Sequence, residues 1–400
     1  MLSWDDTPSI SAMRCSRAWV EVNLDAIHHN VRQFRQILQP PTDLMAVVKA
    51  DAYGHGAVEV ARTALAAGAT WLGVATVPEG IELRQAGLNQ PILVMGALHH
   101  QEEIIALARW QLQPTLVTPK QALVFAEALS DACLPLPVHI KLDTGMSRLG
   151  YNWQQALEFV EFVAGLPALQ ITHLYSHFAT ADEADETEMR RQHERFKHAI
   201  AALQQHSCLP LRLHLANTAA TLTDAAALQY DMVRIGLGIY GLAPAPHLQP
   251  VLDLQPALNV KARITHIKPI TAGAGVSYGH RFIAQRPMTI AVVGIGYADG
   301  VPRLLSNQMQ VLIGDRCVRQ IGAITMDQLM LDVSDIPELT EGDIVTLIGT
   351  SPSHQLSADD WAARIDTISW EILCGFKHRL PRIMPRNHAR KLYPTEDRLL

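Results

Sequence analysis

Short apolar runs alternate with helical patterns along the first 245 residues of the chain. The runs are rich in aliphatic and β-branched residues, as buried parallel strands are. They lie at 44–48, 71–76, 92–95, 114–117, 138–143, 171–178, 211–215 and 232–236. Between them, apolar residues recur at helical spacing, for example over 24–38, 58–65, 78–86, 101–108 and 187–206. About eight strand-helix units in roughly 200 residues predict an α/β fold, a (β/α)8 TIM-type barrel.

A doubly wound sheet is the alternative architecture. It is less favoured because the turn after the first strand lacks a G-x-G-x-x-G pattern, and because the strand count fits a closed barrel. After residue 245 the helical spacing fades, and β-type runs separated by Gly and Pro predict a second, mostly β domain. We therefore expect a disordered leader at 1–16, a barrel at 17–245, a mostly β domain at 246–390 and a tail at 391–400. The strand at 18–23 precedes the barrel, and we expect it to pair with the second domain.

Composition and charge exclude several classes of partner. The 33 Lys and Arg against 39 Asp and Glu give a net charge of -6, which attracts neither nucleic acid nor an anionic membrane. The five cysteines are scattered, odd in number and without metal-ligand spacing, so reduced thiols in a cytoplasmic protein and no metal site are expected. No apolar run is long enough to cross a bilayer.

Polar residues follow several predicted strands, where the active face of a barrel lies. Lys49 follows the first strand, and Tyr53 comes shortly after it. A lysine there suits a Schiff-base or phosphate site, although a solvated lysine beside a packed tyrosine explains the segment equally well. Arg148 lies on a glycine-flanked loop after the fifth strand, where it could bind a carboxylate. Alone, it is better explained as a surface arginine.

The last three strands add a histidine, a helix start and an arginine. His177 follows the sixth strand, where a structural histidine is commoner than a catalytic one, although it could stack on a ring cofactor. Asn217 and Thr218 open a helix after the seventh strand, as a phosphate cradle or an ordinary N-cap would. Arg234 ends the eighth strand beside Gly236, where phosphate often binds. A lysine, a phosphate cup and an arginine in the barrel together point to pyridoxal phosphate.

An ordered set of motifs then makes the chain from Arg17 to Met384 resemble the alanine racemases, fold-type III pyridoxal-phosphate enzymes. The most specific is AVVKADAYGHG at 46–56, the cofactor-lysine signature. The others lie at 139–150, 177–179, 214 with 217–220, 234 with 236, 276–279, 296–300 and 326–328.

The resemblance implies a role for each motif residue. Lys49 would bond the cofactor and serve the D-face of the substrate α-carbon, while Tyr278 serves the L-face. Arg234 would face the pyridine nitrogen, and His214 would buttress it. The remaining cofactor contacts would come from Tyr53, His177, Asn217, Thr218, Gly236 and Leu237, substrate contacts from Arg148 and Met326, and support from Lys141, Tyr297 and Asp327.

The resemblance also implies a head-to-tail homodimer in which Tyr278, Met326 and Asp327 reach the barrel of the other subunit. Lys141 matches a position that is carbamylated in many members and unmodified in others. The product, D-alanine, would supply peptidoglycan synthesis.

Three positions depart from the common family pattern, and three other functions are alternatives to alanine racemisation. Thr325 stands where Cys is frequent, Thr218 replaces Ser, and Trp370 replaces a phosphate-binding Tyr, so we expect mildly weaker cofactor binding. A racemase of broader preference, for serine or lysine, is the runner-up. A decarboxylase on this barrel would place a carboxylate where Arg234 stands. A non-catalytic pyridoxal-phosphate-binding protein is disfavoured by the second domain and Tyr278.

Overall fold

The chain divides into two compact units. The computed structural model describes residues 17–131, 133–208, 212–223 and 226–385. The predicted leader at 1–16 and tail at 391–400 lie outside these ranges. Residues 24–52 and 56–256 form one unit, called here the barrel unit. The described parts of 1–23, 53–55 and 257–400 form the other, called the β unit.

Eight parallel strands of the barrel unit close on themselves, as the described residues show. Each pairs with the next, and the last pairs with the first through Met232–Ile235 beside Asp43–Ala46. The predicted TIM-type barrel is therefore confirmed. Its strands are β2 (Asp43–Val47), β3 (Trp71–Val74), β4 (Ile92–Val94), β5 (Gln113–Leu116), β6 (Leu136–Asp143), β8 (Leu169–Tyr175), β9 (Arg212–His214) and β10 (Met232–Ile235).

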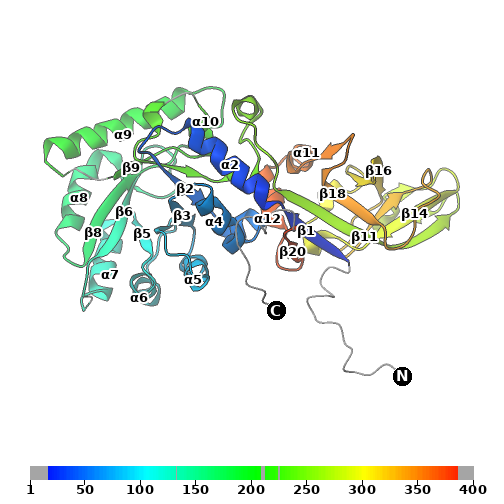
Figure 1. Cartoon of the computed structure of the whole chain (residues 1–400), viewed down its shortest axis with the longest axis horizontal. Helices are drawn as coiled ribbons and strands as arrows, with labels where there is room; N and C mark the ends of the chain where they lie inside the picture. Colours follow the sequence, from blue (N-terminus) through cyan, green and yellow to red (C-terminus); the bar gives the residue numbers. More distant parts are fainter. Residues whose placement is uncertain (1–16, 132, 209–211, 224–225, 386–400) are drawn as a thin grey trace, which may run out of the picture. The chain divides into compact units, whose positions relative to one another are not determined.

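Helices cover the outside of these strands (Figure 1). The α2 helix (Leu24–Ile37), for example, buries Ile27, Val31 and Phe34 on one face. The others are α4 (Ala57–Ala66), α5 (Val77–Gln85), α6 (Gln101–Arg109), α7 (Pro119–Ala128), α8 (Ala156–Ala164), α9 (Thr187–Gln205) and α10 (Thr218–Leu222). The short segment α3 (Lys49–Gly54) follows β2 directly. Within the described residues, no helix combines the length and apolar character needed to cross a membrane.

The β unit is built on a mixed sheet around the long strand β11 (Leu258–Ile270). Strand β1 (Ala18–Val22) pairs antiparallel with β11, so the first strand of the chain joins the second unit as expected. The other strands are β14 (Met288–Val293), β15 (Gln310–Ile313), β16 (Arg316–Ile321), β17 (Leu329–Asp332), β18 (Ile344–Thr350), β19 (Gln355–Leu356) and β20 (Arg382–Ile383), with helices α11 (Ala358–Arg364) and α12 (Ser369–Gly375).

Candidate active site

The turn that follows β2 carries Lys49 and has an unusual backbone. Lys49 is the first residue of α3, and the four non-glycine residues from Ala50 to Tyr53 have φ between 52° and 53°. Left-handed backbone costs roughly 1–2 kcal/mol per L-residue, and runs of it are rare. Such a run persists only where side-chain bonds hold it.

Two carboxylates supply such bonds. Glu79 Oε1 accepts the Ala50 N–H at 2.8 Å, while its Oε2 accepts the amides of Ala75 and Thr76 just before α5. Asp51 Oδ1 accepts the Ala57 N–H at 2.8 Å, which ties the turn to the start of α4. The strained turn is thus anchored at both ends.

Arg234 lies deep in the barrel on β10, with four neutral acceptors around it. Its Nη1 donates to His214 Nδ1 at 3.0 Å, and His214 is the residue that the resemblance places beside it. Its Nη2 donates to His177 Nδ1 at 2.9 Å and to the carbonyls of Ser176 and Leu215. Burial lowers the pKa of Arg234 to about 10. Because neutral acceptors replace a carboxylate here, the guanidinium charge is not cancelled locally.

The loops after β9 and β10 are tied together. Asn217 Oδ1 accepts the Ala220 N–H at 3.0 Å and so caps α10. Thr218 Oγ1 accepts the Gly236 N–H at 2.9 Å. The next segment, η4, runs from Leu237 to Tyr240. These bonds hold the hydroxyl of Thr218 beside the backbone after β10.

Four cations gather at this end of the barrel. Burial lowers the pKa of Lys141 to about 8, and the charges of Arg234, Arg148 and Lys49 lower it as well, against an opposing effect of Asp143. Burial also lowers the pKa of His177, again with contributions from these cations. Repulsion among these positively charged side chains indicates a site that binds anions.

Apart from Tyr53, which is buried, the predicted site residues of the β unit are exposed. The Tyr278 side chain is 73% exposed on η6 (Tyr278–His280), and Tyr297 and Met326 are also exposed. Ser277 has φ 61°, and its hydroxyl donates to the Ala323 carbonyl at 2.8 Å, which fixes the backbone before Tyr278. A cavity of about 560 Å³ lies beside this loop, lined by Lys268, Val276, Tyr278, His280 and Gln328 among others. Trp370 lies half-buried on α12.

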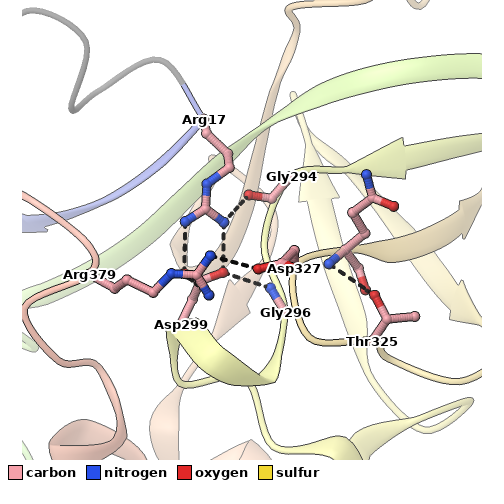
Figure 2. Close-up of polar contacts among 8 residues, drawn as sticks. Arg17, Gly294, Gly296, Asp299, Thr325, Asp327 and Arg379 are labelled. Atoms are coloured by element: carbon pink, nitrogen blue, oxygen red, sulfur yellow. Dashed lines mark hydrogen bonds and ion pairs between the residues drawn. The ribbon is translucent and has the colours of Figure 1, made fainter.

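An ion-pair network in the β unit holds the turn that carries Asp327 (Figure 2). The fully buried carboxylate of Asp299 accepts from Arg17 Nη1 at 2.7 Å and Nη2 at 2.8 Å, and from the Gly296 amide at 3.0 Å. Arg379 Nη1 lies 3.5 Å from Asp299, and its Nη2 donates to Asp327 at 2.6 Å. Asp299 therefore connects the residue before β1 to the Asp327 turn.

Asp299→Asn is expected to destabilise the protein by about 2 kcal/mol, measured from the urea unfolding midpoint and slope. Removing one partner of a buried pair costs roughly 3–5 kcal/mol, reduced here because Arg17 and Arg379 are partly exposed. The matched control is Glu338→Gln, which removes an exposed pair with Arg316 and should cost less than about 0.5 kcal/mol. Equal stability losses in the two variants would contradict the assigned role of Asp299.

Sequence reasoning found Lys141, His214 and Arg234 but missed the buried His139, His173 and Tyr175, and the Arg17 and Arg379 contacts. His139 and Lys141 are two residues apart on β6, and His173 and Tyr175 are two residues apart on β8. Residues two apart face the same side of a strand, so this spacing was a usable signal for an inward-facing polar cluster. The Arg17 and Asp299 pair spans 282 positions, and no local pattern predicts it.

The fold is a closed barrel followed by a mostly β second unit. The barrel has a lysine after its first strand and a buried arginine whose positive charge is not neutralised by a carboxylate. These features define the class as a two-domain barrel enzyme suited to an anionic cofactor. Two family descriptions match: "Alanine racemase, N-terminal domain" over residues 22–244 and "Alanine racemase, C-terminal domain" over 257–384. The chain belongs to the alanine racemase family. Members of this family are pyridoxal-phosphate-dependent isomerases.

Individual relatives agree with the family assignment. The chain is 62% identical to an alanine racemase of Nostoc sp. over 92% of its length and 95% of the relative's. It is 60% identical to one of Synechocystis sp., covering 92% and 99%. Among solved structures, it is similar to the Bacillus anthracis alanine racemase with bound L-Ala-P (36% identity, TM-score 0.87, 93% and 95% covered). It is also similar to the Bartonella henselae enzyme with covalently bound pyridoxal phosphate (29%, 0.82, 92% and 99%).

Proposed function

We propose that the protein interconverts L-alanine and D-alanine with pyridoxal phosphate, using Lys49 and Tyr278 as bases on opposite faces of the α-carbon. The observation that carries this proposal is the cation cluster of Lys49, Lys141, Arg148 and Arg234 after the barrel strands. A phosphate, a phenolate and a substrate carboxylate are the anions that such a cluster would accommodate.

The residues present fit the cofactor. The Leu237 amide and the hydroxyls of Thr218 and Tyr53 would hold its phosphate, next to Asn217, and Gly236 would contribute through its N–H bond to Thr218 Oγ1. Support comes from the bond between Gly236 N–H and Thr218 Oγ1, which leaves the threonine hydroxyl hydrogen to donate elsewhere. When bound, pyridoxal phosphate supplies an aldehyde that bonds an amine and a ring that withdraws electrons from the adjacent α-carbon.

Arg234 would keep the ring nitrogen unprotonated. A carboxylate at that position would stabilise a protonated ring, which withdraws electrons most strongly. Arg234 keeps its own proton, because its pKa of about 10 lies above neutrality, and it carries a positive charge towards the ring. The electron pair left on the α-carbon is then withdrawn less strongly, so it should recapture a proton quickly, as racemisation requires.

Arg148 would bind the substrate carboxylate, with Lys141 orienting it. Burial lowers the pKa of Lys141 to about 8, so a neutral amine is accessible near neutral pH. A neutral amine is the form that adds carbon dioxide, and the resulting carbamate would provide an anion for Arg148. Unmodified Lys141 would instead keep Arg148 turned towards the substrate by repulsion.

Tyr278 of the partner subunit would complete each site in a homodimer. The exposure of Tyr278, Tyr297 and Met326 on a single chain supports this, because large apolar groups gathered at a surface favour association. Asp327, bound by Arg379, would position the Met326 backbone for the substrate. The enzyme would work in the cytoplasm and provide D-alanine for peptidoglycan; the thiols of Cys133, Cys208 and Cys317 form no disulfide, which is in keeping with a reducing compartment.

Incubation with L-alanine, L-serine and L-lysine in deuterated water tests the function. We expect L-alanine to become a mixture of the two enantiomers and to gain α-deuterium. Serine and lysine should react more slowly by at least about tenfold, since a pocket distinguishes such side chains by roughly 1–3 kcal/mol. Faster turnover of serine or lysine would make the broader racemase the correct assignment. The absence of exchange with all three would contradict racemase activity.

A further inference from the structure

Part of the barrel interior is polar, beside the apolar cluster of Met45, Trp71, Leu93 and Met232, although such barrels are usually filled by branched apolar side chains. His139, His173 and His214 are buried there, close to Tyr175 and Arg234. The His139 and His173 rings stack with centroids 4.0 Å apart, and the Tyr175 and His214 rings stack at 4.5 Å. Buried polar groups are costly unless they are hydrogen-bonded, so the bonding partners within this cluster decide how its rings are protonated.

The proton positions on two of these histidines follow from Arg234. A guanidinium has only donors, so His214 Nδ1, 3.0 Å from Arg234 Nη1, must accept. His214 then carries its proton on Nε2 and donates it to His139 Nδ1 at 3.2 Å. His139 in turn carries its proton on Nε2 and donates it to Gln113 Oε1 at 3.0 Å. Every bond from Arg234 to Gln113 runs in one direction.

His173 belongs to the same cluster but not to this series. Its Nδ1 lies 3.0 Å from Thr172 Oγ1, and that hydroxyl already donates to the Val138 carbonyl. His173 therefore carries its proton on Nδ1, the opposite arrangement to His139. Its Nε2 is buried without a partner among the described residues. His173 contacts His139 only through ring stacking, so it provides a matched control.

We propose that Gln113 and His139 are positioning residues that hold His214 in the neutral, Nε2-protonated form required to accept from Arg234. The amide oxygen of Gln113 fixes the tautomer of His139, and His139 fixes that of His214. With His214 reversed, its Nδ1–H would point at a guanidinium N–H, and Arg234 would lose one acceptor and turn. Burial lowers the pKa of both His139 and His214 well below the usual value, which keeps both rings neutral.

A glutamine suits the end of this series better than a glutamate. Gln113 begins β5 and is half-buried, and its oxygen accepts without adding a charge. A carboxylate there would favour a charged His139 and would partly cancel the positive field of Arg234. The inference rests on the proposed function only for the role of Arg234 towards the cofactor ring; the proton positions follow from the barrel unit alone.

Neutron diffraction of the holoenzyme tests the proton positions, because ordinary X-ray maps do not locate them. We expect deuterium on Nε2 of His139 and His214 and on Nδ1 of His173. Deuterium on Nδ1 of His214 would overturn the proposal, whatever the activity of the enzyme. A holoenzyme that shows the expected protons but does not racemise alanine would instead contradict the proposed function.

Variants of Gln113 test the consequence for catalysis. Gln113→Met keeps the side-chain length but removes the acceptor, and kcat for alanine should fall about tenfold with KM little changed, as for other residues that orient a functional group. The absorbance of the bound cofactor should shift in the same variant, since Arg234 moves relative to the ring. Gln113→Glu retains an acceptor oxygen, but the charged His139 that it favours would carry a proton on Nδ1 as well. His214 should then lose the acceptor for its Nε2–H, so kcat should fall in this variant too.

His173→Phe is the control, because it keeps a stacked ring on His139 while removing both ring nitrogens. It should lower stability but leave the cofactor absorbance and kcat close to wild type. If Gln113→Met matches wild type in kcat and absorbance, or if His173→Phe reproduces its effects, the positioning role is wrong and the cluster is only a packed core.

Discussion

Tyr278→Phe is expected to slow alanine racemisation about 10²- to 10⁴-fold, the usual contribution of one general acid-base group. The phenol O–H is the group proposed to exchange a proton on the L-face, and phenylalanine keeps the ring without it. Because the side chain is 73% exposed in the single chain, its removal should change the free energy of unfolding little. Chiral chromatography measures the rate, and absorbance confirms that the cofactor stays bound.

Isotope exchange makes this prediction specific for one face. In deuterated water, the Tyr278→Phe enzyme should still exchange the α-proton of D-alanine through Lys49, without inversion. L-alanine should exchange poorly. The control is Tyr230→Phe, which removes a phenol bonded to His193 on the outside of the barrel and should leave both rates unchanged. Undiminished inversion by Tyr278→Phe would rule out the two-base assignment.

The barrel could be predicted because each strand is a separate apolar run. The strands of the structure differ from the predicted runs only in where they begin and end. The run 71–76 predicts a strand to Thr76, but β3 stops at Val74 because Thr76 forms a capping box with Glu79 at the start of α5. The run 171–178 likewise extends beyond the end of β8 at Tyr175. Side chains that bond their own backbone end strands at positions that hydrophobicity does not mark.

The left-handed turn after Lys49 could not be predicted from residue types. Glycines such as Gly54 and Gly56 adopt positive φ readily, but the residue types of Ala50 to Tyr53 disfavour it. Their conformation depends on the Glu79 carboxylate, which comes from another strand-helix unit. The donor-acceptor direction of the hydrogen bonds from Arg234 to Gln113 could not be predicted from the sequence either, because it depends on which atoms meet inside the closed barrel. Contacts that depend on closure are absent from any local pattern.

Lys49→Ala is expected to abolish both the covalent attachment of the cofactor and proton transfer on the D-face. Racemisation should fall more than about 10⁴-fold, because one residue performs a covalent and an acid-base role. Borohydride reduction followed by mass spectrometry should find no lysine-linked cofactor. Lys120→Ala, which removes a lysine from α7 on the barrel exterior, is the control and should keep full activity. Cofactor still linked at another lysine, with activity retained, would contradict the assignment of Lys49.

Mixed dimers of Lys49→Ala and Tyr278→Phe subunits test whether the two bases of one site come from different subunits. If each site takes Lys49 from one chain and Tyr278 from the partner subunit, a mixed dimer has one site with both defects and one with neither. Dimers purified through two different affinity tags should then recover about half of the wild-type activity, as two-fold symmetry requires. If Lys49 and Tyr278 of the same chain formed each site, both sites of the mixed dimer would carry one defect, and activity would stay at the level of the single variants.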